Sequence, residues 1–177
     1  MLFRSRAELG YVPQEALLFS ETMGENIGYG LDVTDPERIQ QATGIAQLRE
    51  TIAGLPNGFD TRLGERGINL SGGQKQRTAL ARALARAPRV VLLDDALSAV
   101  DTQTEAAILH ELRTALQGRT ALIASHRVSA VRDADHILVL DDGRIVEQGT
   151  HEQLMRLGQR YTELLQRQQL LEAIEAA

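Results

Sequence analysis

The sequence predicts an α/β fold in which helices cover a parallel sheet. Helical and strand-like segments alternate from Ser71 onward, which is the order of strand–helix–strand units. The run Val90–Leu93 is continuously apolar, as expected of a strand that is buried on both faces. The chain has 177 residues, 43% of them hydrophobic, so its size corresponds to about one domain.

The composition excludes several kinds of function. Lys and Arg number 19 against 24 Asp and Glu, a net charge of −5, whereas proteins that bind nucleic-acid phosphates are usually basic. No nucleic-acid partner is therefore expected. The absence of cysteine excludes disulfides, thiolate zinc sites and cysteine nucleophiles. The four histidines show no metal-ligand spacing, and no apolar run approaches the ~18 residues of a membrane-spanning helix.

The region before Ser71 is predicted to contain a short strand and a polar helical segment. Leu9–Pro13 forms the strand, which leads into a loop. Residues 20–67 are predicted to be helical and polar. Glycine and proline interrupt this segment at Gly30, Pro36, Gly54 and Pro56.

The helix after Ser71 is predicted from a narrow apolar stripe. Leu80 and Leu84 lie one turn apart, with alanines beside them. Pro88 ends this helix because proline cannot continue the hydrogen-bond ladder. Asp101 is placed to cap the helix that follows the first apolar strand.

Two further strands and a hairpin are predicted near the C-terminus. Thr120–Ala124 is expected to be a second buried strand and Ile137–Leu140 a third. Asp141–Gly143 is a hairpin signal that leads into Arg144–Glu147. Thr150 is placed to cap a last helical region, whose leucines have near-helical spacing. That stripe is either a partner-binding face or core packing followed by a frayed tail.

A glycine-rich helix start is the first candidate for chemistry. Leu70–Gln74 opens a helix, whose N-terminus exposes unpaired N–H groups and carries partial positive charge. Gly72 and Gly73 let a phosphate approach the backbone, and the Ser71 hydroxyl can add a hydrogen bond. Because Ser71 can equally be a plain N-cap, these residues alone indicate only an anion-binding loop.

Polar residues follow two of the apolar strands. One strand ends in Asp94 and Asp95, a pair of carboxylates that can hold Mg²⁺ and polarise a water molecule. The next ends in Ser125 and His126, at the end of a parallel strand where ligands bind in α/β folds. Each feature alone is compatible with a structural role. Their order, together with the glycine-rich helix start, is much harder to explain by chance.

This ordered set of motifs resembles the nucleotide-binding domain of ABC transporters. Leu70–Gln74 matches the LSGGQ signature of that family, and Val90–Asp94 is similar to its Walker B strand. The resemblance extends from about Leu9 to Leu157. The remaining matches are Tyr11–Gln14 to the Q-loop, Ser98–Asp101 to the D-loop and His126 to the switch histidine.

The resemblance implies a P-loop NTPase-like core, incomplete at its N-terminus, with an α-helical subdomain. The core corresponds to residues 9–14 and 87–157, the helical subdomain to about 20–86, and a C-terminal helical tail to 158–177. Together these parts are expected to make a single, partial ABC ATPase domain over residues 1–177.

Members of this family pair head to tail around two ATP molecules. Each ATP lies between the phosphate-binding loop of one domain and the signature of the other. Asp101 is implied to tie the D-loop to the facing site. The resemblance implies that the signature residues bind ATP held by a second nucleotide-binding domain: Ser71, Gly72, Gly73 and Gln74.

Other residues are implied to serve the chain's own site, with ATP and Mg²⁺ as cofactors. Asp94 is implied to hold Mg²⁺ through water, and Gln14 to sense the γ-phosphate and the metal. Asp95 stands where the family has its water-orienting or general-base carboxylate. His126 is implied to contact the γ-phosphate and the attacking water. Catalysis would rest on positioning and charge neutralisation during phosphoryl transfer.

The first departure from the family is the absence of a G-x-x-x-x-G-K-[ST] phosphate-binding loop. The single lysine, Lys75, lies in the signature helix. We therefore expect the chain to be the C-terminal part of a longer polypeptide, inactive in ATP hydrolysis when alone. Without the strands that the loop normally joins, Val90–Leu93 is expected near an unpaired sheet edge, which favours aggregation.

The second departure is Asp95, where the family usually has glutamate. Aspartate is one methylene shorter, and a displacement of about 1 Å can lower a rate about a hundredfold. This resembles the degenerate site of heterodimeric exporters, whose intact signature completes the competent site of the partner. A homodimer with a slower base is the alternative.

An exporter subtype is indicated by the segment before the signature. Gly64–Gly67 resembles the X-loop of exporters, in which Glu65 and Arg66, together with Gln14, would contact coupling helices of a transmembrane domain. Gln14–Ser20 is also exporter-like. We expect the ATPase portion of an exporter at the cytoplasmic face of the membrane, the chain itself being soluble or peripheral. The alternatives are a soluble ABC ATPase and a non-hydrolysing remnant that donates its signature.

Overall fold

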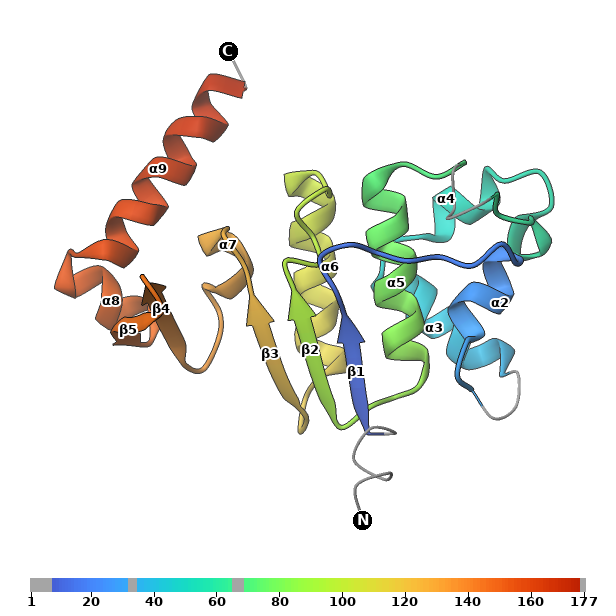
Figure 1. Ribbon diagram of the computed structural model, residues 1–177, viewed down its shortest axis with the longest axis horizontal. Helices are drawn as coiled ribbons and strands as arrows, with labels where there is room; N and C mark the ends of the chain where they lie inside the picture. The colour runs from blue at the N-terminus through green and yellow to red at the C-terminus, as the bar shows by residue number, and fades with distance from the viewer. Residues whose placement is uncertain (1–7, 32–34, 65–68, 176–177) are drawn as a thin grey trace. The chain divides into compact units, whose positions relative to one another are not determined.

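The computed structural model describes residues 8–31, 35–64 and 69–175 (Figure 1). The chain forms two compact units, Met1–Ala124 and Ser125–Ala177. Each unit has its own hydrophobic core. The first unit is built on a parallel sheet, and the second on an antiparallel hairpin.

A parallel sheet is the centre of the first unit. Its strands are β1 (Leu9–Val12), β2 (Val90–Asp94) and β3 (Thr120–Ala124), in the order β1-β2-β3. Leu92 of the central strand lies opposite Tyr11 on one side and Leu122 on the other. The carboxyl ends of the strands therefore lie at the same edge of the sheet (Figure 1).

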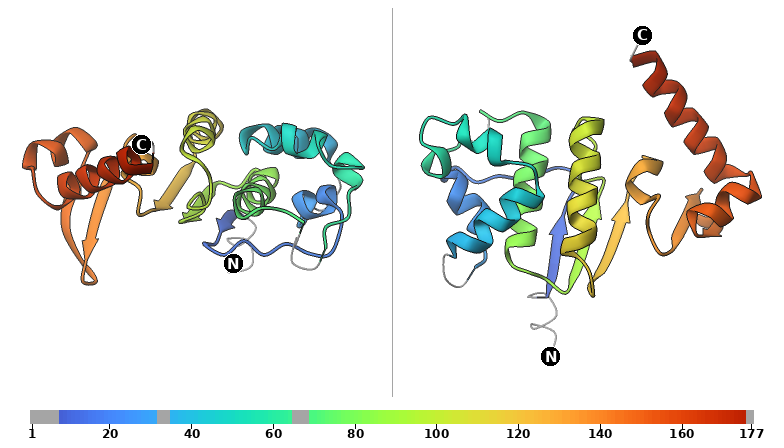
Figure 2. Two further views of the ribbon diagram at one scale, coloured as in Figure 1. Left: turned by 90° about the horizontal axis from the view of Figure 1, so that it is seen from above. Right: turned by 180° about the vertical axis from the view of Figure 1, so that it is seen from behind.

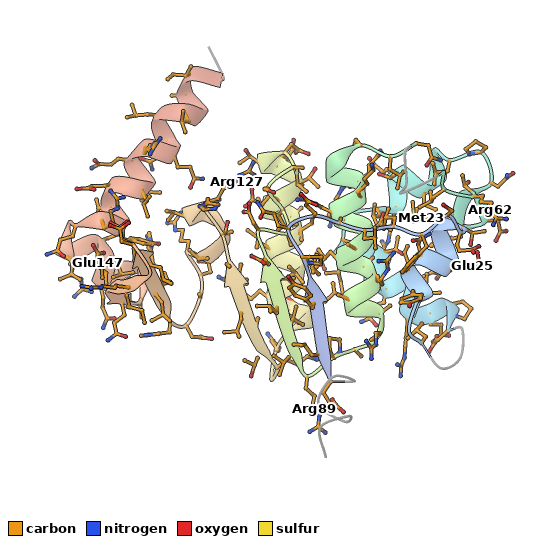
Figure 3. The ribbon with its side chains drawn as sticks, viewed as in Figure 1. Met23, Glu25, Arg62, Arg89, Arg127 and Glu147 are labelled. Carbon is orange, nitrogen blue, oxygen red and sulfur yellow. The ribbon has the colours of Figure 1, made fainter. Side chains whose placement is uncertain are left out.

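Short helices and turns fill the segment between β1 and β2. They are α2 (Met23–Gly28), α3 (Pro36–Ile45), α4 (Arg49–Ala53), the 3₁₀ turn η1 (Gly58–Asp60) and α5 (Gly72–Ala85). Pro36, predicted as an interruption, is the first residue of α3, where proline has no helical N–H bond to lose. Asp35 caps this helix through the N–H of Glu37. Thr22 and Glu25 cap α2 reciprocally. Figure 3 labels Glu25.

One hydrophobic core joins the sheet to α5 and to α6 (Thr102–Ala115). Val91 and Leu93 of β2 are buried in it, together with Ile108 of α6. Leu80 and Leu84 of α5 are buried in the same core, which confirms the predicted apolar stripe. Figure 2 shows α6 in front of the sheet in the view from behind.

β3 differs from its prediction as a buried strand. Its side chains are mostly exposed, and that of Leu122 is 57% exposed. Among the described strands β3 pairs only with β2, so it forms an edge of the sheet. The strand at Val90–Leu93, predicted near an unpaired edge, is paired on both sides, and its residues alternate between buried and half-buried. An apolar run indicates a strand but not its place in the sheet.

The second unit is built on the predicted hairpin. β4 (Ile137–Asp141) pairs with β5 (Arg144–Gly149) across Asp142 and Gly143. The prediction of β4 as a buried strand is wrong, because its side chains alternate between buried and exposed and Leu140 is 67% exposed. Both turn residues have positive φ, 46° and 72°, which is what a type I′ turn requires. The helices of this unit are α7 (Val128–Val131), α8 (His151–Leu157) and α9 (Arg160–Glu175).

The last helical region consists of two helices rather than one. Thr150 caps α8 as predicted, and Gly158 ends it in a left-handed conformation. Buried Glu147 of β5 then accepts hydrogen bonds from the backbone N–H groups of Arg160 and Tyr161 (Figure 3). A strand carboxylate thus caps α9 and fixes its start against the hairpin.

The C-terminal apolar stripe is only partly buried. Leu154 and Tyr161 pack in the core of the second unit, whereas Leu170, Leu171 and Ile174 are exposed. Core packing therefore accounts for the first part of the stripe and not for its last turns. Among the residues that the structure describes, no helix combines the length and apolar character needed to cross a membrane.

Candidate functional site

The carboxyl end of β2 brings together side chains from distant parts of the sequence. Tyr11 Oη donates to Asp94 Oδ2 at 3.4 Å, and Gln14 Nε2 donates to Asp95 Oδ2 at 3.5 Å. Tyr11 lies in β1 and Gln14 in the loop that follows it. Because β1 and β2 are parallel neighbours, their ends meet at one edge of the sheet. Three of the predicted site residues, Gln14, Asp94 and Asp95, therefore lie together.

Asp95 has a backbone conformation that few residues other than glycine adopt. Its φ is 46°, in the left-handed region that aspartate tolerates better than most residues. Its N–H donates to the Ala124 carbonyl at 2.9 Å, and its carbonyl accepts from Ser98 Oγ at 2.9 Å. The backbone that carries the candidate catalytic carboxylate is thus fixed on both sides.

Ser71 caps α5 in a reciprocal pair with Gln74. The N–H of Gln74 donates to Ser71 Oγ at 3.2 Å, and the N–H of Ser71 donates to Gln74 Oε1 at 2.9 Å. Ser71 and Gly72 are exposed at the start of this 14-residue helix. The capping role that the sequence left open is therefore present, at a helix start of the kind that binds phosphate.

Gly73 lets α5 lie directly against the D-loop (Ser98–Asp101). A Cβ on Gly73 would lie 2.7 Å from the carbonyl oxygen of Ala99, which is backbone and cannot rotate away. A Cβ on Gly72 would meet Ala99 Cβ at 3.4 Å, an ordinary contact. Gly73 therefore has a packing role in addition to the predicted approach of a phosphate.

Asp101 caps α6, as the sequence predicted. The N–H of Thr104 donates to Asp101 Oδ1 at 2.9 Å. This bond is the main reason why the pKa of Asp101 lies below its ordinary value, and the positive charge of Arg77 adds to it. Burial lowers the pKa of Arg77, and the charge of Asp101 opposes that effect. The signature helix and the D-loop are thus also linked by charge.

Gln76 of α5 is a residue that sequence reasoning missed. Its side chain is 5% exposed. Its Nε2 lies 3.0 Å from Ser98 Oγ, and its Oε1 accepts from the N–H of Ala99 at 2.9 Å. The sequence held one signal, since Gln76 precedes Ala79 and Leu80 by one helical turn and so shares their buried face.

Arg82 of α5 was also missed, although it ties three segments together. It donates to the Leu17 carbonyl at 2.7 Å and to the carbonyl and side-chain oxygens of Asn26 at 2.8 and 2.7 Å. Its guanidinium lies 5.0 Å from the centre of the Phe19 ring. Arg82 therefore holds α5 to α2 and to the segment that follows Gln14. An arginine in a helical stretch of sequence carries no signal for these contacts.

The structure leaves the roles of three further predicted residues untested. His126 is exposed and belongs to the second unit, so its role stays a prediction. Glu65 and Arg66 lie outside the described residues. Their expected contact with a transmembrane domain therefore also stays a prediction.

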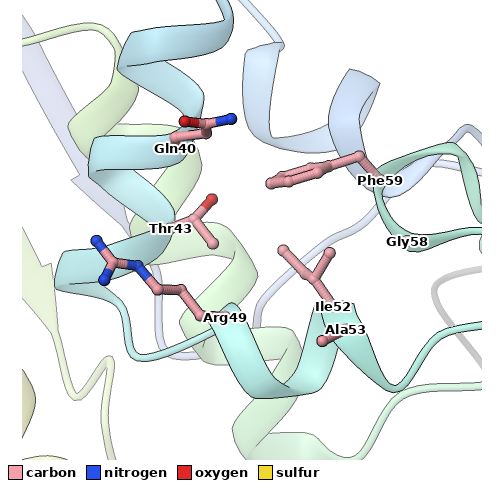
Figure 4. A pocket seen from close by; sticks show the side chains of 7 residues that line it. All are labelled: Gln40, Thr43, Arg49, Ile52, Ala53, Gly58 and Phe59. Carbon is pink, nitrogen blue, oxygen red and sulfur yellow. The ribbon is translucent and has the colours of Figure 1, made fainter.

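A pocket of about 420 Å³ lies among α3, α4 and η1 (Figure 4). In Figure 4 the Phe59 ring points from η1 toward α3. The Thr43 hydroxyl already donates to the Ile39 carbonyl at 2.6 Å. None of the lining residues is a predicted site residue, so the pocket is separate from the candidate site. The lining residues are Gln40, Thr43, Arg49, Ile52, Ala53, Gly58 and Phe59.

The residues at the carboxyl end of β2 fit the protein ligands of a Mg²⁺ site. Mg²⁺ is commonly held by one or two carboxylates together with substrate phosphates. Asp94 and the amide of Gln14 supply oxygen donors of that kind. In the described part of the chain, no three His, Asp or Glu side chains form an all-protein metal site. The residues present therefore fit the protein ligands of Mg²⁺ and the signature that contacts ATP. The phosphate-binding loop is missing, because the sequence has no G-x-x-x-x-G-K-[ST] motif.

Comparison with known protein families supports this interpretation of the site. The family described as "ABC transporter" matches residues 2–98, more than half of the 177-residue chain. The chain therefore belongs to the ABC transporter family. This confirms the resemblance on which the interpretation of the motifs rests.

Similar proteins are considerably longer than this chain. The Bacillus subtilis (strain 168) protein named "Probable multidrug resistance ABC transporter ATP-binding/permease protein YheI" is 51% identical over 175 residues, 98% of this chain and 30% of its own length. An ATM1-type heavy metal exporter of Novosphingobium aromaticivorans is 47% identical over 163 residues, 92% of this chain and 27% of its own. The chain thus spans less than a third of these relatives.

A solved structure supports the fold. A chain of a bacterial Atm1-family ABC exporter with ATP bound has a TM-score of 0.87 and 47% identity, and the match covers 92% of this chain and 29% of that one. The mixed α/β class with a parallel sheet is thereby confirmed, in agreement with a P-loop NTPase-like core. The division into core, helical subdomain and tail stays a prediction.

Proposed function

We propose that the chain is part of the nucleotide-binding domain of an ABC exporter and that it acts in ATP-driven transport at the cytoplasmic face of a membrane. The observation that carries this proposal is the meeting of Gln14, Asp94 and Asp95 at one sheet edge, in a chain with an intact LSGGQ signature at Leu70–Gln74. The exporter names of the relatives support the transport role.

The residues at this edge have complementary tasks in the proposal. Asp94 would hold the Mg²⁺ of Mg-ATP. When bound, Mg²⁺ would neutralise phosphate charge during transfer. Asp95 orients the attacking water and accepts its proton. Gln14 donates to Asp95 Oδ2, which keeps that carboxylate at the sheet edge. Gln14 also lies on the segment through which a coupling helix of a transmembrane domain would act.

The signature serves a second nucleotide-binding domain in the proposal. Ser71 and Gly72 are exposed at the start of α5, where a bound phosphate would face backbone N–H groups and the helix dipole. A head-to-tail pair would place these residues on ATP held by the phosphate-binding loop of the other domain. The chain itself has no such loop motif, so alone it is expected not to hydrolyse ATP.

Asp95 favours a second form of this function, in which the chain belongs to a weakened site of a heterodimer. Aspartate reaches less far than glutamate by one methylene, about the displacement that costs a hundredfold in rate. The left-handed φ of 46° suits aspartate, so the short residue is well accommodated here. Under this form the chain contributes chiefly its signature to a competent partner site.

The test is complementation of ATP hydrolysis. This chain would be mixed with the nucleotide-binding domain of the N. aromaticivorans exporter, and phosphate release would be measured against either protein alone. We expect turnover to rise in the mixture, and the rise to vanish with Ser71→Arg, which blocks the signature. Asp95→Asn is the matched control, because it changes the chain's own site and leaves the signature intact. Turnover by the purified chain alone, or no rise in the mixture, would contradict the proposal.

A further inference from the structure

Gln76 connects three segments, the signature helix, the Q-loop and the D-loop. It lies in α5, two residues after the end of the signature at Gln74, and its side chain is buried. Nε2 donates to Ser98 Oγ at 3.0 Å and lies 3.5 Å from the carbonyl oxygen of Gln14. Oε1 accepts from the N–H of Ala99 at 2.9 Å. One side chain thus contacts the Q-loop and the D-loop from the signature helix.

The contacts of Gln76 continue to the candidate catalytic carboxylate. Ser98 Oγ, which accepts from Gln76, donates in turn to the Asp95 carbonyl at 2.9 Å. Gln14, whose carbonyl faces Gln76, donates from its own side chain to Asp95 Oδ2 at 3.5 Å. These four residues form a closed ring of hydrogen bonds that holds Asp95 by its backbone and by its carboxylate.

Packing reinforces the hydrogen bonds at the same place. Gly73 precedes Gln76 by one helical turn, and its bare Cα lies against the Ala99 backbone. The helix therefore meets the D-loop at two points one turn apart, first by close packing and then by the amide of Gln76. Two such points fix both the distance of α5 from the D-loop and its rotation about its own axis.

We propose that Gln76 is a positioning residue that makes the signature helix, the D-loop and Gln14 move as one body. The inference rests on the proposed function, in which the signature acts on ATP held by a second domain while Gln14 and Asp95 act in this chain's own site. A displacement of the signature is then carried through Gln76 to Asp95. The two composite sites of a pair become coupled through a single buried amide.

The first experiment tests the link in the chain alone. Hydrogen exchange of the Ala99 amide would be compared in the native chain, Gln76→Met, which keeps the volume, and Gln76→Glu, which keeps the acceptor. The matched control is Thr43→Val, which removes a buried hydrogen bond within α3. We expect Gln76→Met to speed Ala99 exchange about tenfold, as the loss of one hydrogen bond implies, with Thr43→Val close to the native chain. Gln76→Glu should fall between them, because its carboxylate keeps the acceptor for Ala99 but is buried without the donor to Ser98.

The second experiment tests the consequence in the complementation mixture. Gln76→Met is expected to lower kcat of the stimulated hydrolysis at least about tenfold with an unchanged KM for ATP, since misplacement rather than binding is affected. A merely destabilising change such as Thr43→Val lowers the amount of active complex without this pattern after correction for the folded fraction. Gln76→Glu, which keeps the Ala99 bond, is expected to retain part of the activity.

The outcomes separate the inference from the proposed function. If the native chain gives no stimulation, the proposed function fails, while the exchange of Ala99 still decides whether Gln76 holds the D-loop. If Ala99 in Gln76→Met exchanges as slowly as in Thr43→Val, the inference is overturned. It is also overturned if the native chain stimulates hydrolysis and Gln76→Met does so with the same kcat.

Discussion

A methyl group on Gly73 would lie 2.7 Å from the carbonyl oxygen of Ala99, closer than real Cβ atoms approach any atom. The partner atom is a backbone oxygen, so no side-chain rotation relieves the contact. We expect Gly73→Ala to push α5 from the D-loop and to lower the free energy of unfolding by about 1–3 kcal/mol. Urea denaturation followed by circular dichroism measures this loss.

Gly72→Ala is the matched control for that prediction. The added methyl would meet only Ala99 Cβ, at 3.4 Å, which is an ordinary contact. Alanine is also favoured over glycine within a helix by about 0.5–1 kcal/mol. Gly72→Ala should therefore leave stability unchanged or raise it. Equal losses in the two variants would mean that the contact with Ala99 does not determine the requirement for glycine.

Arg82 is expected to be a major source of stability in the first unit. Its guanidinium donates to Leu17 and twice to Asn26, and it lies over the Phe19 ring. Arg82→Ala should lower the free energy of unfolding by about 2–4 kcal/mol, because several partner oxygens lose their donors. Arg82→Lys should recover little of this loss, since an ammonium group cannot reproduce the planar fork of donors. Thermal and urea unfolding would both report the effect.

Arg89 provides the control for Arg82. Its side chain is 85% exposed and pairs with Glu8 at 3.4 Å near the start of β2 (Figure 3). Exposed ion pairs contribute little to stability, so Arg89→Ala should change the unfolding midpoint only slightly. A loss as large as that of Arg82→Ala would show that arginine content, rather than the contacts of Arg82, is responsible.

Local features of the fold were predictable from the sequence. Asp101 caps α6 and Thr150 caps α8, because a cap depends on residues within one turn of each other. The hairpin was predictable because its turn requires positive φ, which Asp142 and Gly143 adopt more readily than most residues. The meeting of Gln14 with Asp95 was predictable only through the order of family motifs, since 81 positions separate the two residues.

Features that depend on distant neighbours were not predictable in the same way. The run at Thr120–Ala124 is apolar like a buried strand, yet it forms a sheet edge with exposed side chains. The contacts of Gln76 and Arg82 join segments whose spacing in sequence carries no rule. Sequence patterns report which face of an element is apolar, whereas a buried polar side chain is defined by the partners that folding brings to it.

The edge strand β3 is expected to promote self-association. Leu122 is 57% exposed on a strand whose pairing is with β2 alone among the described strands, and such edges pair with other chains. Leu122→Lys places a charge on this strand and should raise the monomer fraction at high concentration without lowering the melting temperature. Sedimentation velocity over a concentration series measures the change.

Leu170→Lys separates the effect of a strand edge from that of exposed apolar surface. Leu170 is 65% exposed, but it lies on α9 rather than on a strand. If strand pairing drives association, Leu170→Lys should leave the monomer fraction close to that of the native chain. An increase equal to that of Leu122→Lys would instead assign the association to apolar surface in general.

The stability contributed by Asp101 should depend on pH in a defined direction. The Thr104 N–H holds the pKa of Asp101 in the folded chain below its ordinary value of 3.8. Stability from this carboxylate is therefore fully present above pH 3.8 and is lost as the pH falls through the lower, folded pKa. Asp101→Asn keeps an N-cap but cannot titrate, so it should be less stable than the native chain near neutral pH and converge with it in acid. Thermal midpoints of both proteins across this range measure the difference, and a difference that does not change with pH would contradict the assignment.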